Sequence, residues 1–274
     1  MFLRPLLFIL ILLCSMHSQA QVNATTEKLT IGEVHTLHSA ILKENRMLNI
    51  YLPPKYDAKV KYSVIYLLDG SRDEDFPHIT GLVQFFNLMF AMPDVIIVGI
   101  ANVDRKRDFT FPTTDKKQKE DFPTTGHSAD FIRFLKDELQ PYIESKFSTG
   151  PNKYLIGQSL GGLIASELLL HHTALFTHYL IVSPSLWWDN ESLLDDASAR
   201  YAAQTQKPAF IYIAAGADEP ARMKKDASRL YDTLKATKGG QTEIIFNLMD
   251  KENHATILHN SIYDALIHLF PYKG

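Results

Sequence analysis

The chain has 274 residues, of which 46% are hydrophobic and 22% are charged, and its formal net charge at pH 7 is -3. These values are typical of a globular chain with one substantial core, which need not be divided into domains. The weak negative charge gives no reason to expect nucleic acid as a partner. Cys14 is the only cysteine, so the rest of the chain has neither a disulfide nor thiol chemistry.

The first twenty residues differ from the rest of the chain. Arg4 is their only charged side chain, and Leu6 to Cys14 form an unbroken apolar run. This pattern predicts a signal peptide cleaved after Ala20, because the run is too short to span a bilayer comfortably. An uncleaved N-terminal anchor is the alternative. We therefore expect residues 1–20 to direct export to the periplasm or medium, and residues 21–274 to form a domain that leaves the membrane after cleavage.

Strand and helix patterns alternate along the mature chain. Apolar alternation and continuous apolar runs predict strands at residues 30–52 (two strands), 62–68, 94–100, 153–156, 178–184, 209–216 and 242–248. Helical patterns lie at residues 81–90, 128–143, 163–170, 221–235 and 256–270. Strands that alternate with helices imply right-handed crossovers. We expect a single α/β domain with a mainly parallel central sheet and helices on both faces.

Residues 102–126 are polar, contain prolines and show no clear periodicity. A loop of this length inside a domain is usually functional or disordered. Its basic side chains are nearly balanced by acidic ones, so we interpret most of it as a solvated lid or rim. Ser128 then caps a predicted helix, which Pro141 should kink or shorten.

The segment Gly157-Gln158-Ser159-Leu160-Gly161-Gly162 joins a predicted strand to a predicted helix. Gly-x-Ser-x-Gly in this context is typical of a nucleophile elbow, a tight turn that strains the serine backbone and lifts its hydroxyl clear of the sheet. Side chains at the flanking glycines would collide with neighbouring backbone. Because the bare pattern also occurs by chance, a base, an acid and an oxyanion hole must accompany Ser159 if it is a nucleophile.

A serine hydroxyl needs a general base to take its proton. In the α/β-hydrolase order the acid follows the nucleophile and the histidine comes last. His254 lies in a loop after the last predicted strand and is the candidate base. Asp218 and Glu219 both follow the preceding strand. Either carboxylate could orient the imidazole, or could serve only at the start of the next helix.

An oxyanion hole needs two backbone N–H groups aimed at the developing charge. Leu160, directly after the candidate nucleophile, should supply one of them. Ser71, or alternatively Arg72, should supply the other, because it follows Asp69-Gly70 at the end of an earlier predicted strand. The alternative for Asp69-Gly70 is a plain turn.

Both tryptophans of the chain, Trp187 and Trp188, follow a predicted strand at the sheet edge where ligands bind. They could form an apolar wall for an acyl or alcohol group, or they could pack at the rim. The sequence contains no spacing of side chains typical of a metal site and no glycine-rich phosphate loop. We therefore expect neither a metal nor a cofactor.

These motifs together resemble the esterase D-like branch of the α/β-hydrolases, especially esterases of the enterochelin (siderophore) esterase kind. The resemblance covers nearly the whole mature chain and rests on residues 46–54, 66–70, 98–100, 105–110, 134–143, 157–162, 183–188 and 254. It implies Ser159 as nucleophile, His254 as base and, of the two carboxylates, Glu219 as acid. It also implies that Arg105 or Arg107 touches an anionic ligand.

The expected function is that of an exported serine carboxylesterase that acts on a small-molecule ester through an acyl-enzyme. The ester could belong to a siderophore. The alternatives are an esterase for acetyl or feruloyl groups on carbohydrate, an acyltransferase, and a non-catalytic ligand-binding protein with the same fold.

Overall fold

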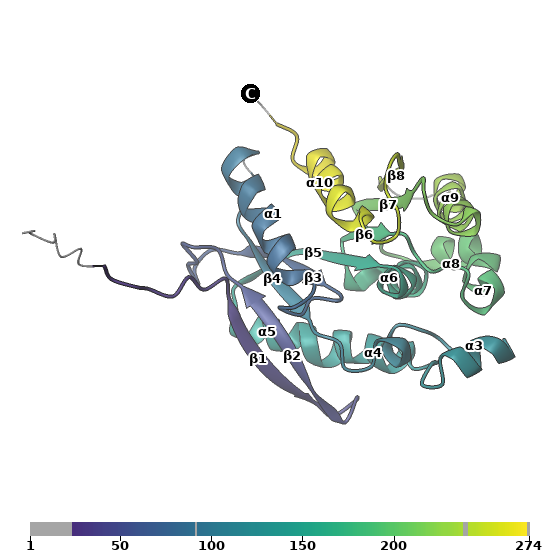
Figure 1. Cartoon of the computed structure of the whole chain (residues 1–274), viewed down its shortest axis with the longest axis horizontal. Coiled ribbons are helices and arrows are strands. Elements are labelled where there is room, and N and C mark those ends of the chain that lie inside the picture. Colours follow the sequence, from purple (N-terminus) through teal and green to yellow (C-terminus); the bar gives the residue numbers. More distant parts are fainter. Residues whose placement is uncertain (1–23, 91, 238–240, 273–274) are drawn as a thin grey trace, which may run out of the picture. The chain divides into compact units, whose positions relative to one another are not determined.

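A twisted sheet organises the chain (Figure 1). The computed structural model describes residues 24–90, 92–237 and 241–272, and within them the sheet has eight strands in the order β1-β2-β4-β3-β5-β6-β7-β8. The strands are β1 Glu33–Ser39, β2 Glu44–Tyr51, β3 Tyr62–Leu67, β4 Val95–Ile100, β5 Thr149–Gln158, β6 His178–Val182, β7 Phe210–Gly216 and β8 Glu243–Met249. β2 is antiparallel to both of its neighbours, and the remaining pairings are parallel. The predicted mainly parallel sheet is confirmed. The predicted signal peptide, residues 1–20, lies outside the described residues.

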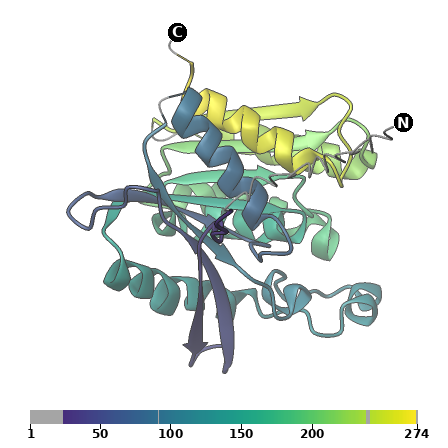
Figure 2. The ribbon, with the colours of Figure 1, turned by 60° about the vertical axis from the view of Figure 1, so that its left-hand side comes forward.

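Helices cover both faces of the sheet, and Figures 1 and 2 show α1 and α10 side by side on one of them. The larger helices are α1 Phe76–Met89, α4 Ser128–Phe134, α5 Gln140–Lys146, α6 Leu160–His171, α8 Ala197–Ala203, α9 Ala221–Ala236 and α10 Ile257–Leu269. Along β3, Val64 and Tyr66 pack in the core beneath α4, α6 and α9, whereas Ile65 and Leu67 pack in the core beneath α1 and α10. Burial on both faces explains why the parallel strands are continuous apolar runs. Within the described part of the chain, no helix is both long and apolar enough to cross a bilayer.

The segment from 102 to 126 was predicted as an aperiodic loop, and this prediction is wrong for two stretches. α2 (Arg105–Asp108) and α3 (Lys116–Asp121) lie within it. Each is capped by the aspartate that precedes it: the Asp104 side chain accepts a hydrogen bond from the Arg107 N–H, and Asp115 accepts one from the Gln118 N–H. The other short elements are η2 Thr173–Leu175, η3 Trp188–Glu191 and α7 Ser192–Asp195. Helices this short contain too few residues to show an apolar repeat.

The helix after residue 126 begins one residue earlier than predicted. His127, not Ser128, is the residue that precedes it, and the Ser128 hydroxyl instead donates to Glu167 Oε1 at 3.1 Å. Pro141 interrupts the helix as expected, because it has no N–H to donate to the preceding turn. A π-helical turn, η1 (Leu135–Leu139), separates α4 from α5 directly before it.

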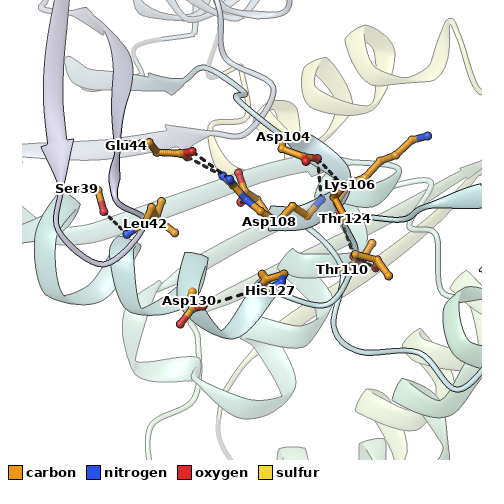
Figure 3. A network of polar contacts seen from close by, with 12 residues as sticks. Ser39, Leu42, Glu44, Asp104, Lys106, Asp108, Thr110, Thr124, His127 and Asp130 are labelled. Carbon is orange, nitrogen blue, oxygen red and sulfur yellow. Dashed lines mark hydrogen bonds and ion pairs between the residues drawn. The ribbon is translucent and has the colours of Figure 1, made fainter. Parts of the chain in front are cut away.

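A buried ionic cluster fastens α2 to the β1–β2 hairpin (Figure 3). Arg46 of β2 pairs with Asp108, and both side chains are buried. Arg107 donates to Asp108 Oδ1 at 2.7 Å and to both oxygens of Glu44, at 2.6 Å and 3.0 Å. Buried charges need oppositely charged partners, so this cluster fixes the position of the first part of the 102–126 segment relative to the hairpin. The segment is therefore anchored at its start to the main sheet.

Candidate active site

Ser159 lies in the turn between β5 and α6, with φ +59° and ψ -118°. A serine rarely adopts a positive φ, and the tight packing around the turn explains why it does here. A Cβ added to Gly157 would lie 2.3 Å from the Gly161 carbonyl oxygen, and one added to Gly162 would lie 2.9 Å from Pro184 Cα. Only glycine fits at these positions, so the backbone has the geometry expected of a nucleophile elbow.

His254 and Glu219 meet beyond the ends of β8 and β7. His254 Nδ1 lies 2.7 Å from Glu219 Oε1; the His254 side chain is 42% exposed and the Glu219 side chain is 0% exposed. Glu219 Oε2 accepts a further hydrogen bond from the Gly216 N–H at 3.1 Å. Burial opposes ionisation of Glu219, but the hydrogen bonds from His254 and the Gly216 N–H outweigh it and lower the pKa of the carboxyl. An ionised carboxylate here fixes Nδ1 as the protonated nitrogen of a neutral imidazole and leaves Nε2 free to accept a proton.

Gln158, the residue before the elbow serine, ties the His254 loop to the elbow. Its Nε2 donates to the His254 carbonyl oxygen at 2.6 Å. The Ser159 hydroxyl lies 3.4 Å from the Ser185 hydroxyl, and within the described residues it has no hydrogen bond to His254. Catalytic hydrogen bonds are often long or absent before substrate binds. The elbow and the histidine loop are thus held together through the backbone of His254.

The loop after β3 lies against the first turn of α6. Asp69 has φ +54°, and its Oδ2 is 3.2 Å from the position of a Cβ added to Gly161. Gly70 donates its N–H to Ile100 O at 3.0 Å, so it cannot also serve an oxyanion. The Ser71 N–H is only weakly engaged, 3.4 Å from Glu74 Oε2. The Leu160 N–H has no acceptor within the described part of the chain, as expected at a helix N-terminus.

The two arginines expected near an anionic ligand are both paired within the chain. Arg105 makes a two-point ion pair with Asp69, at 2.6 Å and 2.9 Å, and donates to the Gln158 carbonyl oxygen at 3.1 Å. Arg107 is held by the cluster with Glu44 and Asp108. Arg105 therefore links the loop after β3 to the residue before the elbow serine, a structural role that its sequence position did not indicate.

The two tryptophans occupy different environments. Trp188 is 0% exposed, and its indole N–H donates to the Phe111 carbonyl oxygen at 2.8 Å. Its ring also packs edge-on against Phe122, with centroids 5.3 Å apart. Trp187 is half-buried. Of the two alternatives given for this pair, packing describes Trp188, and Trp187 is the one with surface left for a ligand.

Two contacts of this site were not predicted from the sequence. Gln158 and Ser185 both lie inside motifs that the sequence singles out, but their partners are 96 and 26 residues away along the chain. The sequence contains two signals for these contacts: a polar residue directly before the elbow serine, and a serine between Pro184 and the tryptophan pair. Neither signal predicts which atom the side chain contacts.

Known proteins share this sequence pattern and fold. A family model described as "Putative esterase" matches residues 39–258. The ferri-bacillibactin esterase BesA of Bacillus subtilis is 29% identical over 265 residues, which cover 88% of this chain and 91% of that protein. An IroE-like serine hydrolase from Shewanella oneidensis has a TM-score of 0.78 at 32% identity, covering 87% of this chain and 80% of that one. The siderophore hydrolase EstA of Aspergillus nidulans, with a TM-score of 0.73, 18% identity and coverage of 90% and 98%, shares the fold.

Proposed function

The chain belongs to the esterase family, in its enterochelin esterase-like α/β-hydrolase branch, and is a carboxylic-ester hydrolase. From that premise we propose that Ser159, His254 and Glu219 form its catalytic triad and that the substrate is a siderophore ester. The observation that carries the triad is the contact between His254 Nδ1 and the buried Glu219 carboxylate at 2.7 Å. It gives the imidazole the orientation and tautomer that a general base needs.

The proposed reaction proceeds through an acyl-enzyme. His254 Nε2 takes the Ser159 proton while Oγ forms a bond to the ester carbonyl carbon. The carbonyl oxygen becomes an oxyanion, which the N–H groups of Leu160 and Ser71 stabilise. His254 then gives its proton to the leaving alkoxide as the carbon–oxygen bond breaks. Water, deprotonated by His254, releases the acyl group and restores Ser159.

The names of two relatives and the position of Trp187 support a siderophore ester as the substrate. BesA is named a ferri-bacillibactin esterase, and EstA is named a siderophore hydrolase. We propose that the half-buried Trp187 contacts an aromatic arm of such a ligand, because an indole face offers apolar contact at little entropic cost. Trp188 supports Trp187 from the core. For Arg105 or Arg107 to bind an anionic group, the group would have to compete with Asp69 or Glu44.

Substitution of the nucleophile is the first test. We expect Ser159→Ala to lower turnover of a small activated ester by about 10³-fold or more while the melting temperature stays close to that of the parent. Ser166→Ala is a matched control, since Ser166 is a buried serine on α6, the helix that follows Ser159, and among the described residues its hydroxyl donates to the Gly162 carbonyl oxygen alone. Undiminished turnover by Ser159→Ala would overturn the triad.

A panel of esters tests the substrate class. The parent protein is given a ferric catecholate trilactone, a ferric hydroxamate ester, a feruloyl ester and a short acyl ester, each with and without an alcohol acceptor. We expect the highest kcat/KM on a siderophore ester, with the free acid as product. Preference for the feruloyl ester would reject the siderophore ester as substrate, and transfer of the acyl group to the alcohol would reject hydrolysis as the reaction. Neither result would contradict the proposed triad.

Export is proposed from residues 1–20 alone. The expected result is a mature protein that begins at Gln21 and is found outside the cytoplasm, as measured by intact mass after cell fractionation. An unprocessed N-terminus in the cytoplasmic fraction would contradict it.

A further inference from the structure

The turn Ser183-Pro184-Ser185, directly after β6, is locked onto the nucleophile elbow. The Ser185 N–H donates to the Ser159 carbonyl oxygen at 3.0 Å, and the Ser159 N–H donates to the Val182 carbonyl oxygen at 3.1 Å. Pro184 lies against Gly162, where a Cβ on that glycine would approach Pro184 Cα to 2.9 Å. The backbones of the two turns therefore cannot move independently.

This lock holds one side chain beside the proposed nucleophile. Ser185 is 2% exposed, and its Oγ lies 3.4 Å from Ser159 Oγ. Within the described residues, this is the only hydrogen bond of either hydroxyl. A buried hydroxyl costs free energy unless it is bonded, and alanine would fill nearly the same space without that cost. A serine here is thus better explained by a polar function than by packing.

We propose that Ser185 is a further catalytic residue, whose hydroxyl donates a hydrogen bond to Ser159 Oγ during attack on the ester. The proposal rests on the proposed role of Ser159 as nucleophile. The positions of the two oxygens allow either hydroxyl to be the donor, and the proposal assigns that role to Ser185.

The chemistry of the attack favours Ser185 as the donor. Ser159 has one proton, which must pass to His254 Nε2, and two lone pairs on Oγ. One lone pair forms the bond to the carbonyl carbon, and the other remains to accept a hydrogen bond from Ser185. The Ser185 proton stays on its own oxygen throughout, so the step remains balanced. While the Ser159 proton is passing to His254 and before the bond to the carbonyl carbon is complete, Oγ is more electron-rich than at rest, and the Ser185 hydrogen bond strengthens.

The distance fits a contact that matters more in the transition state than at rest. Hydrogen bonds between hydroxyls are normally shorter than 3.0 Å, so at 3.4 Å the resting contact is weak. A group that stabilises developing charge more than the ground state raises kcat without tightening substrate binding. The opposite direction, with Ser159 as donor, would hold its proton away from the base and slow the reaction.

The test follows phosphonylation of the serine by a fluorophosphonate, which needs nucleophilic attack and no ester substrate. For Ser185→Ala we expect the second-order rate constant to fall roughly tenfold at every pH while labelling still reaches completion. On an activated ester, kcat should fall by a similar factor with KM unchanged. Ser185→Thr, which keeps the hydroxyl, should recover most of the rate. Ser166→Ala, which removes a buried hydroxyl from the same helix as the elbow, measures any purely structural effect.

An unchanged phosphonylation rate in Ser185→Ala would overturn the proposal, and a faster rate would show that Ser159 is the donor. A loss matched by Ser166→Ala, or no recovery with a folded Ser185→Thr, would assign Ser185 a structural role and also overturn it. These outcomes are distinct from failure of the triad itself, because that failure appears as undiminished activity of Ser159→Ala.

Discussion

Asp218 and Glu219 are neighbours in the chain, but their carboxylates lie in different surroundings. Asp218 is exposed, and its N–H donates to the Glu252 carbonyl oxygen at 3.0 Å. Glu219 is buried against the Gly216 N–H and His254. A turn that follows a buried strand sends successive side chains in different directions, so one points to solvent and the next to the site. This difference gives a matched pair of substitutions.

We expect Glu219→Gln to lower kcat on an activated ester by about 10²–10⁴-fold, because the amide no longer selects the imidazole tautomer or stabilises its charged form. Asp218→Asn, the same chemical change one residue earlier, should stay within about twofold of the parent, in line with exposed substitutions. Steady-state kinetics of both variants, with circular dichroism as a check on folding, measures the contrast. Equal losses, or a larger loss in Asp218→Asn, would reject Glu219 as the acid.

The order of strands along the chain was enough to predict Ser159 and His254 as partners, because each follows a strand whose end lies at the same sheet edge. It could not separate Glu219 from Asp218, and the family resemblance made that choice. It also could not predict what Arg105 binds. The Asp69 partner of Arg105 is 36 residues away, and the partner of the Trp188 indole is 77 residues away. Such pairings depend on packing that no local pattern records.

Among the elements, the short helix α2 acts on the site through Arg105. Its two-point ion pair with Asp69 and its bond to the Gln158 carbonyl connect α2, the loop after β3 and the end of β5. Asn102 Nδ2 also donates to Asp69, at 2.6 Å. The loop that carries the proposed oxyanion donor Ser71 is therefore positioned by the Asn102 amide, which precedes α2, and by the Arg105 guanidinium at its first residue.

Removal of the Arg105 guanidinium should affect both stability and catalysis. We expect Arg105→Ala to cost about 2 kcal/mol, the scale of hydrogen bonds to a charged group, and so to lower the melting temperature by about 4–8 °C. Loss of the fixed loop position should also lower kcat about tenfold with a smaller change in KM. Thermal unfolding and steady-state kinetics measure the two effects.

Arg133→Ala is the control for Arg105, because Arg133 makes an exposed pair with Asp130 at 3.2 Å, a kind of pair worth little. Arg105→Lys should give intermediate values, since an ammonium group cannot reproduce the two-point contact. If Arg105→Ala kept full kcat with a lowered melting temperature, Arg105 would stabilise the fold without positioning the loop.

Elements with strong periodicity were predicted well, and those set by turns or by contacts were not. The strands β3, β4, β6 and β7 and the helices α9 and α10 begin and end within two residues of the predicted positions, whereas β5 begins at Thr149, before the predicted start at Lys153, and α6 begins at Leu160, before the predicted start at Leu163. α1 begins at Phe76, five residues before the predicted start at Gly81, because Pro77 is accepted in the first turn of a helix. α7 and α8 were missed: they are four and seven residues long, and they gain their order from packing against larger elements.

At the scale of the whole molecule, α6 joins the elbow to the helices on its face of the sheet. Glu167 of α6 accepts a hydrogen bond from Ser128 of α4, and its Oε2 is buried with no hydrogen-bond partner within the described residues. Burial raises the pKa of the Glu167 carboxyl to about 7, although Ser128 and the charge of Arg200 act in the opposite direction. A raised carboxyl pKa means that the folded state holds a proton that the unfolded chain has already lost.

This difference makes stability depend on pH with a definite sign. Between the ordinary pKa of 4.5 and the folded value of about 7, each step up in pH weakens the folded state, so the contribution of Glu167 is lost above about pH 7. Glu167→Gln cannot ionise and keeps the acceptor for Ser128. The free energy of unfolding of the variant can differ from that of the parent already at about pH 5. Between about pH 5 and about pH 8 we expect this difference to change in favour of the variant by on the order of 2 kcal/mol.

Urea unfolding of both proteins at the two pH values measures this gain directly, because it compares free energies of unfolding and any constant cost of the amide cancels. Glu120→Gln, at an exposed position on α3, shows how much of the change comes from removing a negative charge from the molecule as a whole. A gain equal to that of Glu120→Gln would mean that water reaches Glu167 Oε2. Water can reach this atom only if α4 and α6 separate locally in the folded molecule, so the free energy of that opening would have to be small. The helix that follows the nucleophile elbow would then be less rigid than its packing implies.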